Sequence, residues 1–363
     1  MDASRTLPAY RTGTEQYSVS LLRTLMRMET PHRWRLIAPG PPPDDLLPLP
    51  PRWEWRVIRF PRLWTHLRLS WEMARHRPDV LFVPAHVVPI IHPRATVVTI
   101  HDLGYRRFPE AHTASSRRYL DWSTRWSVRA ARRVIAVSGA TRDDLVTMLA
   151  VPEKKITVVH HGVRPVVDRL SDNAVRATVE RLGITPPYVL FLGTVQPRKN
   201  LQRLIGAFRQ VVDAGLPHTL VIAGRMGWLR EPIYAAVAEC GLTARVHFTG
   251  YVADDDLPAL YTGAAAFAFP SLFEGFGMPA LEALSYGLPV VASNTTSLPE
   301  IVGDAGLLVD PLDEAALGAA LVRAVTDDTL RARLAIAGPE RSARFTWERC
   351  ARETLAVLEG AAR

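Results

Sequence analysis

The chain has little cysteine, no long apolar run and no internal repeat, and each absence excludes a class of protein. Its two cysteines, Cys240 and Cys350, stand far apart and outside any CxxC or Cys/His cluster, which excludes a disulfide framework and a zinc site. The chain has no stretch of about 18 apolar residues, so no transmembrane helix is predicted. No period of about 20–50 residues repeats, which excludes solenoids and propellers. We expect a cytoplasmic protein that is either soluble or attached peripherally to the inner face of a membrane.

Length and charge divide the chain into two parts. Its 363 residues, 48% of them hydrophobic, exceed what a single core usually holds, so we expect two domains. Residues 1–165 carry 26 Lys and Arg against 14 Asp and Glu, whereas residues 166–363 carry 18 against 22. The first part is therefore basic and the second is mildly acidic.

Short apolar runs alternate with amphipathic helical patterns throughout the chain. This alternation predicts parallel β-sheets with helices on both faces. The expected strands are WRLIAP, DVLFVP, ATVVTIHD, RVIAVS, KITVVHHG, YVLFLGT, HTLVIAG, RVHFTG, AFAFPS, LPVVAS and GLLVD. We place an N-terminal Rossmann-like domain at 1–165, a second Rossmann-like domain at 166–340, and a C-terminal helix at 341–363 that packs back on the first domain.

The beginning of the chain departs from this pattern. An α/β domain normally opens with a buried strand, but Met1 is followed by DASRTLPAYRTGTEQYS, which predicts a loop leading into the helix YSVSLLRTLMRM. We therefore expect the first strand of the N-terminal domain to be missing.

A cationic loop follows the strand YVLFLG. Gly193 ends the strand, Arg198 and Lys199 follow, and Asn200 stands where it can cap the next helix. Two cations beside a helix N-terminus suit a diphosphate, because the free amides and the positive end of the helix dipole add to their charge. The alternative is a solvated pair of loop charges.

Two glutamates flank a glycine-containing turn in FEGFGMPALEA. Gly275 and Gly277 allow a ligand to approach the backbone closely, and the helix from Met278 directs free N–H groups toward it. Glu274 lies before this helix and Glu282 lies within it, so both carboxylates can face one site and accept hydrogen bonds from vicinal hydroxyls. The alternative is a helix-dipole partner and an exposed helix residue.

The strand RVHFTG ends beside a third candidate position. There the backbone of Gly250 and Val252 could contact a base, on which Tyr251 could stack, although such a tyrosine is often only packing. GFGMPA also fits the GxGxxA dinucleotide pattern, but a proline interrupts the turn and no acidic residue ends the next strand, so a nicotinamide dehydrogenase is the weaker interpretation.

Together these motifs resemble the retaining glycosyltransferases of family 4, whose GT-B architecture has two facing Rossmann-like domains with a cleft between them. The E-x7-E pattern runs from Glu274 to Glu282, and GTVQPRKN, FTGYV and LPEIVGDAGLLVDP follow the family's landmarks in order. The closest similarity is to bacterial mannosyltransferases of surface-polysaccharide and O-antigen assembly. A GT-B nucleotide-sugar epimerase shares the architecture and is an alternative. A GT-B phosphorylase shares it too, but no lysine is placed for a pyridoxal Schiff base.

The resemblance implies a role for each matched residue. Arg198 and Lys199 neutralise the departing diphosphate, Glu282 holds the ribose hydroxyls, and Glu274 with the Phe276–Met278 backbone holds the transferred sugar. In the first domain, Gly13 and Thr14 match a phosphate-closing loop, and His101 in TIHDLGY matches a histidine near the donor sugar and the acceptor. The implied partners are GDP-mannose or a UDP-sugar as donor and a glycan or lipid-linked acceptor. Retention, no cofactor and no metal are expected.

The basic first domain has two further explanations. It could bind nucleic acid, which the family resemblance argues against, or an anionic membrane. PRWEWRVIRFPRLWTHLRLSW and SSRRYLDWSTRWSVRAARR interleave arginine with tryptophan, as interfacial helices do. The alternative is that these tryptophans pack internally while the arginines are solvated.

Overall fold

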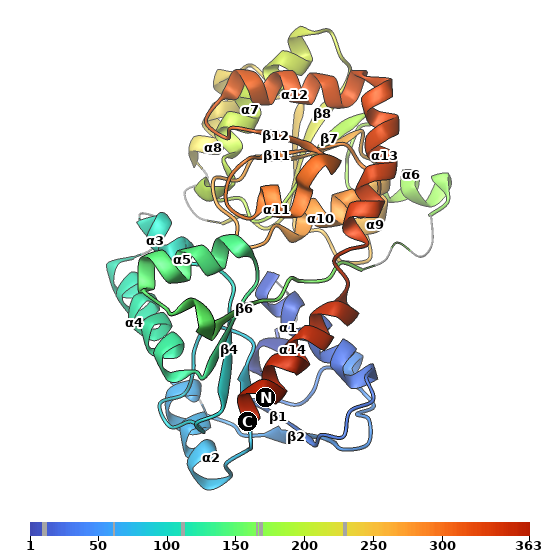
Figure 1. Ribbon diagram of the computed structural model, residues 1–363. Coiled ribbons are helices and arrows are strands. Elements are labelled where there is room, and N and C mark those ends of the chain that lie inside the picture. The colour runs from blue at the N-terminus through green and yellow to red at the C-terminus, as the bar shows by residue number, and fades with distance from the viewer. Residues whose placement is uncertain (9–12, 61, 110–112, 165, 167–169, 228–230) are drawn as a thin grey trace. The chain divides into compact units, whose positions relative to one another are not determined.

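The computed structural model divides the 363 residues into two compact units (Figure 1). It describes every residue except 9–12, 61, 110–112, 165, 167–169 and 228–230. Unit 1 consists of Met1–Gly162 and Phe345–Arg363, and unit 2 consists of Val163–Arg344. The chain thus passes from unit 1 to unit 2 after Gly162 and returns to unit 1 after Arg344.

Unit 1 contains a parallel four-stranded sheet in the order β3-β4-β5-β6 and a parallel pair, β1-β2. Consecutive residues of the central strands bury their side chains on opposite faces. In β4, Val97 packs into a core with helices α1 and α14, whereas Val98 and Ile100 pack into a second core with α2, α4 and α5. Burial on both faces explains why these strands are continuous apolar runs.

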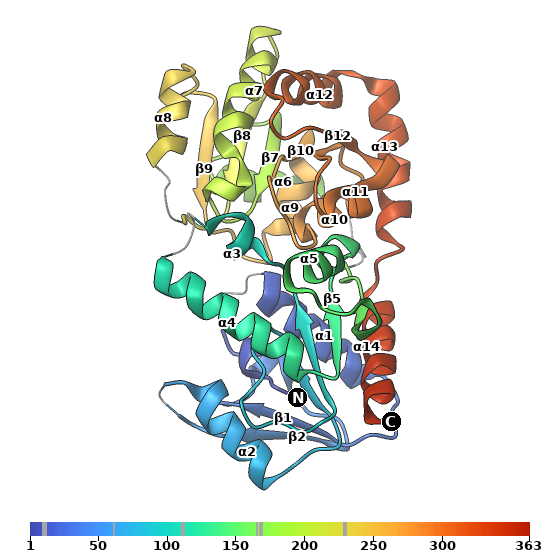
Figure 2. The ribbon, with the colours of Figure 1, turned by 60° about the vertical axis from the view of Figure 1, so that its left-hand side comes forward.

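The strands of unit 1 are β1 (Trp34–Ala38), β2 (Trp53–Val57), β3 (Leu81–Val83), β4 (Thr96–Ile100), β5 (Arg133–Ala136) and β6 (Ile156–Val158). Its helices are α1 (Gly13–Arg27), α2 (Ser70–Arg75), α3 (Gly104–Arg107), α4 (Ala114–Ala130), α5 (Gly139–Leu149) and α14 (Trp347–Ala362), with a π-helical turn η3 (Trp64–Leu69). Helix α14 lies beside α1 in both views (Figures 1 and 2) and buries Trp347, Cys350 and Leu358.

The first residues of the chain take part in the sheet of unit 1. Asp2 forms a parallel bridge with Ile37 of β1 and donates its backbone N–H to Phe82 of β3 at 2.9 Å. Met1–Ala3 therefore lie between β1 and β3. The sequence interpretation had expected the first strand of this domain to be missing.

Two local predictions for unit 1 are wrong. WEWRV forms strand β2, because its apolar side chains alternate and Trp53 stacks on Trp34 of β1 at 4.7 Å. Helix α1 begins at Gly13 rather than Tyr17, so Gly13 and Thr14 lie in its first turn and not in a loop.

Unit 2 is a single six-stranded parallel sheet in the order β12-β11-β10-β7-β8-β9. Its strands are β7 (Tyr188–Leu192), β8 (Thr219–Ala223), β9 (Val246–Gly250), β10 (Ala266–Phe269), β11 (Val290–Ser293) and β12 (Leu307–Val309). The chain runs outward from β7 to β9 and then crosses back to β10 on the other side of β7. The strand order therefore reverses between β7 and β10.

Two groups of helices cover this sheet. Helices α7 (Leu201–Asp213) and α12 (Glu314–Thr326) pack side by side with α8 (Glu231–Glu239) next to α7 (Figure 2). The other group pairs α6 (Asp172–Arg181) with α9 (Leu257–Gly263) and α10 (Met278–Ser285) with α11 (Leu298–Val302) and α13 (Asp328–Ser342). The predicted α/β class, with parallel sheets, is confirmed.

Candidate functional site

The predicted cations and the first glutamate of unit 2 meet where the strand order reverses. The 3₁₀ turn η6 (Pro197–Lys199) follows β7 and presents Arg198 and Lys199, and Glu274 follows β10, the neighbouring strand. The Leu272 N–H donates to the Arg198 carbonyl at 2.9 Å and ties the two loops together. Ligands of open α/β sheets bind at such a reversal, outside the carboxyl ends of the strands.

Arg198, Lys199 and Glu274 form one ion cluster. The Lys199 ammonium donates to Glu274 Oε1 at 2.5 Å, and Arg198 Nη1 lies 3.2 Å from Oε2 and 2.6 Å from the Phe273 carbonyl. Lys199 and Glu274 are only 6% and 8% exposed, and the Lys199 nitrogen also lies 4.8 Å from the centre of the Phe269 ring. The cluster therefore holds a buried lysine with a net charge of one positive unit, which excludes a solvated loop pair.

Burial alone would raise the pKa of the Glu274 carboxyl, but the charges of Lys199 and Arg198 outweigh it and lower that pKa. Glu274 is thus ionised at neutral pH. It accepts hydrogen bonds here, and the two cations bring positive charge to the carboxyl end of β7.

The helix after this turn begins differently from the prediction. Asn200 stands before α7 in a left-handed conformation, with φ of 59°, and its side chain makes no capping hydrogen bond. Its amide nitrogen instead donates to the Pro311 carbonyl at 2.7 Å, and its oxygen accepts from Arg203. Asn200 therefore links η6 to the segment after β12.

The turn from Glu274 to Met278 is fixed by the loop that follows β11. Thr296 Oγ1 accepts the Glu274 N–H at 3.1 Å, and Ser297 Oγ lies within 3.1 Å of the carbonyls of Glu274 and Phe276. Gly277 has φ of 98°, and a β-carbon there would meet Leu298 at 2.6 Å, so glycine is required. The rest of this turn is buried up to Gly277, while Met278 at the start of α10 is partly exposed.

Glu282 lies on α10, apart from the cation cluster in its contacts. Its Oε2 accepts the hydroxyl of Tyr261 at 2.8 Å, and burial raises the pKa of its carboxyl. The two glutamates thus differ: Glu274 is paired with cations, whereas Glu282 is held by a neutral donor.

Three consecutive strands of unit 2 end in glycines with positive φ: Gly193 after β7, Gly224 after β8 and Gly250 at the end of β9. A β-carbon on Gly224 would lie 2.1 Å from the Gly193 carbonyl oxygen, so these two backbones touch. The neighbouring strands β7, β8 and β9 therefore each end in a residue that has no side chain. Sequence reasoning identified Gly193 and Gly250 but missed Gly224, although Gly224 directly follows the apolar run of its strand, as Gly193 does.

The two residues after Gly250 differ in exposure. Tyr251 is 45% exposed, so its ring is accessible for stacking, whereas Val252 is 5% exposed and packs in the core. The Val252 side chain is therefore not available to a ligand.

In unit 1, Gly13 and Thr14 open α1, and His101 follows β4. The His101 ring packs edge-on against Tyr17 of α1, with ring centres 4.9 Å apart, and Nε2 donates to the Pro84 carbonyl at 2.9 Å. Burial, assisted by His86, lowers the pKa of His101 to about 4. The imidazole is therefore neutral at pH 7, with Nδ1 as its acceptor.

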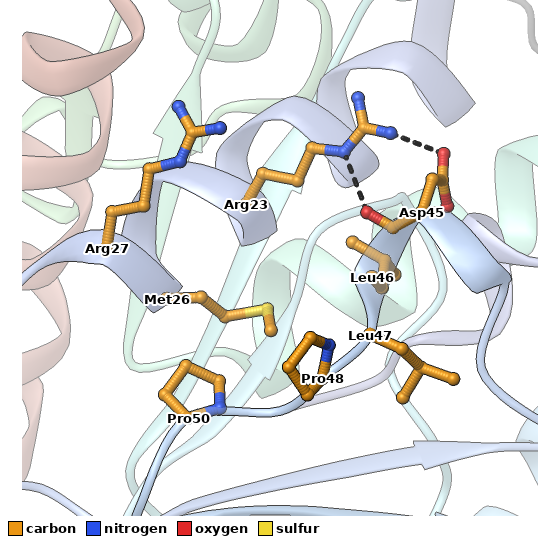
Figure 3. Close-up of a pocket in the computed structure, with 8 residues that line it drawn as sticks. All are labelled: Arg23, Met26, Arg27, Asp45, Leu46, Leu47, Pro48 and Pro50. Carbon is orange, nitrogen blue, oxygen red and sulfur yellow. Dashed lines mark hydrogen bonds and ion pairs between the residues drawn. The ribbon is translucent and has the colours of Figure 1, made fainter.

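A separate pocket of about 410 Å³ lies in unit 1, at the end of α1 distant from Gly13 (Figure 3). Arg23 crosses it and donates to the Asp45 carboxylate at 2.5 Å. The remaining lining residues are Met26, Arg27, Leu46, Leu47, Pro48 and Pro50. None of the predicted site residues lines this pocket.

Neither a metal-binding cluster nor a membrane-spanning helix occurs among the described residues. No group of three or more His, Cys, Asp and Glu side chains is placed to hold a metal ion. Within the same residues, no helix has the length and apolar character needed to cross a membrane.

Comparison with known proteins assigns both halves of the chain. The family described as Glycosyltransferase Family 4 matches residues 11–166, and that described as Glycosyl transferases group 1 matches residues 177–341. O-antigen chain mannosyltransferase B of Escherichia coli is 32% identical over 307 residues, which cover 82% of this chain and 79% of that protein. The serotype-specific mannosyltransferase WbdA of Escherichia coli is 30% identical over 225 residues, 61% of this chain but only 26% of WbdA.

Solved structures give the same fold. Alr3699/HepE of Anabaena, crystallised with UDP and glucose, has a TM-score of 0.75 and 20% sequence identity, with 97% of each chain covered. The expected GT-B architecture is therefore confirmed.

Proposed function

The chain belongs to family 4 of the glycosyltransferases, and we propose that it transfers mannose from GDP-mannose to a glycan or lipid-linked acceptor during polysaccharide assembly. Two mannosyltransferases of Escherichia coli among its relatives support the sugar and the pathway. A UDP-sugar is the second donor to test, since the similar Anabaena fold was solved with UDP.

The observation that carries this proposal is the buried cluster of Arg198, Lys199 and Glu274 at the strand-order reversal. Transfer breaks the bond between the sugar and the diphosphate, so negative charge develops on the departing phosphate. Positive groups already fixed beside that position stabilise the charge without reorganising. We assign this role to Arg198 and Lys199, and the surrounding backbone glycines suit a diphosphate lying close to the strand ends.

The other site residues complete the proposed reaction. Glu282 binds the ribose, Tyr251 and the Val252 backbone face the base, and Glu274 with Gly275–Met278 holds the sugar. The family resemblance assigns His101, whose imidazole is neutral at pH 7, to the donor sugar and the acceptor substrate. The acceptor attacks from the face that the diphosphate leaves, through an oxocarbenium-like state, so the anomeric configuration is retained. No cofactor or metal takes part in this proposal.

A thermal-shift screen with GDP, UDP, NAD and pyridoxal phosphate tests the proposal, because a ligand that binds only the native state raises its stability. We expect a shift with GDP, followed by transfer from GDP-mannose that continues in EDTA. Stabilisation by NAD alone would favour a dehydrogenase, and conversion of the free nucleotide sugar without an acceptor would favour an epimerase.

We further propose that unit 1 binds an anionic membrane through exposed apolar and aromatic side chains of η3, α2 and α4. Trp53, Trp55, Trp64 and Trp126 do not belong to this surface: Trp53 stacks on Trp34, and the indole N–H groups of the other three donate to backbone carbonyls. For these four tryptophans the alternative of internal packing therefore holds, and the proposed surface is smaller than the two sequence segments.

That surface has two parts joined by one histidine. One part consists of Leu67 on η3 and Trp71 on α2, and the other consists of Tyr119 and Trp122 on α4. The exposed fraction of each residue is 45–59%. His66 connects them, since its Nε2 lies 3.0 Å from the Tyr119 hydroxyl and its ring centre lies 5.3 Å from that of Trp122. Exposed arginines on these elements include Arg75, Arg117 and Arg118, and Arg62 is exposed just before η3. Aromatic groups among cations suit an anionic lipid interface.

Co-sedimentation with anionic and neutral vesicles tests this surface. We expect binding to anionic vesicles that salt reverses, and a roughly tenfold loss when Trp71 and Trp122 are both replaced by serine. Ile336→Ser, which removes a 65% exposed apolar side chain from unit 2, is the matched control. Equal binding to neutral vesicles, or competition by DNA at the same salt concentration, would contradict the proposal.

A further inference from the structure

The ribose contact assigned to Glu282 depends on how its carboxylate is held. Glu282 is partly buried on α10, and its Oε2 is engaged by the Tyr261 hydroxyl at 2.8 Å. A carboxylate binds a diol well only if its oxygens face the hydroxyls, and a free glutamate side chain samples several rotamers. The tyrosine removes that freedom.

Tyr261 is itself fixed on α9 and does not depend on a ligand for its position. It is 2% exposed, its ring stacks on Tyr286 at 5.1 Å with an interplanar angle of 16°, and Phe267 lies 5.9 Å away. Its hydroxyl is 3.5 Å from the Pro279 carbonyl, much farther than from Glu282. The hydroxyl is therefore directed at one carboxylate oxygen by a ring that cannot turn away.

We propose that Tyr261 is a positioning residue for nucleotide recognition: it occupies Oε2 of Glu282 and so presents Oε1 to the ribose hydroxyls of the donor. The inference rests on the proposed function, because it assumes that Glu282 binds ribose. Tyr261 itself does not contact the donor. Its contribution is to fix the rotamer of Glu282 and to keep the carboxylate ionised.

The charge of Glu282 depends on the same hydrogen bond. Burial raises the pKa of this carboxyl, and the Tyr261 hydrogen bond opposes that rise. Arg164 lowers the pKa of Glu282 and Asp254 raises it, while Tyr286 stacks on the Tyr261 ring. Loss of the hydroxyl should raise the pKa of Glu282 further, so nucleotide affinity would begin to fall at a higher pH on acidification.

The experiment compares Tyr261→Phe with Tyr188→Phe. Each variant keeps the aromatic ring and deletes one buried hydroxyl whose hydrogen bond involves a residue of α9. The Tyr188 hydroxyl, however, donates to the Leu260 carbonyl at 2.7 Å and not to Glu282. Calorimetric titrations of each protein use GDP and 2′,3′-dideoxy-GDP, and the corresponding uridine pair. The ratio of the two affinities measures recognition of the ribose hydroxyls alone.

We expect the wild type to prefer the ribonucleotide, and Tyr261→Phe to bind it about tenfold more weakly, which corresponds to about 1.4 kcal/mol. Its affinity for the dideoxynucleotide should be unchanged. In transfer assays the donor KM should rise by a similar factor with little change in kcat, since ribose is unaltered during the reaction. Tyr188→Phe should keep the wild-type preference.

The outcomes distinguish failure of the ribose role of Glu282 from failure of the positioning role of Tyr261. A wild type that binds no nucleoside diphosphate, or binds both forms equally, overturns the proposed function or the ribose role of Glu282. A wild type that prefers ribonucleotides, with Tyr261→Phe keeping the full preference, overturns only the positioning role. Equal weakening of both nucleotides in Tyr261→Phe would also overturn it, because that pattern indicates general damage to unit 2.

Discussion

Replacing Glu274 by glutamine is the most informative single change, because it leaves the buried Lys199 without its carboxylate. The two charged atoms are 2.5 Å apart, which at an effective dielectric constant of about 20 corresponds to roughly 6–7 kcal/mol of attraction. Desolvation offsets part of that attraction, and removal of one partner from a buried ion pair costs about 3–5 kcal/mol. Since glutamine retains an oxygen acceptor, we expect a loss of about 3 kcal/mol in the stability of unit 2.

Calorimetric unfolding measures this loss of stability. The unfolding transition of unit 2 is identified as the one that nucleoside diphosphates shift to a higher temperature. A loss of about 3 kcal/mol should lower its Tm by roughly 6–12 °C. Asp213→Asn is the matched control, because Asp213 pairs with Arg209 at 2.7 Å while both side chains are more than half exposed. Such surface pairs contribute about 0–1 kcal/mol.

Nucleotide binding supplies the second measurement for Glu274→Gln. Without its carboxylate the cluster carries two positive charges instead of one, so the variant should bind GDP at least as tightly as the wild type while its kcat falls. A variant as stable as the wild type within about 0.5 kcal/mol would show that Lys199 does not depend on Glu274. Loss of nucleotide binding with normal turnover would refute the assignment of the sugar to Glu274.

Three further predictions concern other residues. Lys199→Ala and Arg198→Ala should each lower kcat by roughly 100-fold or more in transfer assays, and unchanged rates in both would remove their role at the diphosphate. Glu282→Ala should mainly raise the donor KM, measured by saturation kinetics, and wild-type nucleotide affinity would contradict that role. Because the pKa of His101 is about 4 in the folded state and about 6.5 when unfolded, the unfolded chain binds the extra proton between these values. Stability should therefore fall as pH drops from 6.5 toward 4, by up to ~3 kcal/mol, and His101→Asn should flatten that slope in pH-dependent denaturation.

The α/β fold could be predicted from the sequence because buried parallel strands are continuous apolar runs. Strands β4 and β7 read as TVVTI and YVLFL, and each has buried neighbours on both faces, so local composition and tertiary position agree. Strand β2 was missed for the opposite reason. WEWRV alternates apolar and charged residues and is only half buried, and its arginine–tryptophan pattern also fits an interfacial helix.

The candidate site was predictable residue by residue but not as an arrangement. Arg198, Lys199 and Glu274 were each identified from their position after a strand. Their mutual contact depends on β7 and β10 being neighbours, which follows from the chain crossing over β7 after β9. Tyr261 gave no signal at all, because an aromatic residue in a short helix usually indicates packing, and its partner lies 21 positions away.

The ion cluster also explains how a charged ligand site can be built into a buried part of unit 2. An unpaired charge on a lysine as buried as Lys199 would cost stability, and Glu274 supplies the anion that pairs with it. A diphosphate carries more negative charge than one carboxylate, so it can compete for the same cations and leave Glu274 available to the sugar. The contributions of Glu274 and Lys199 to binding and turnover are then coupled, and their separate effects should not add.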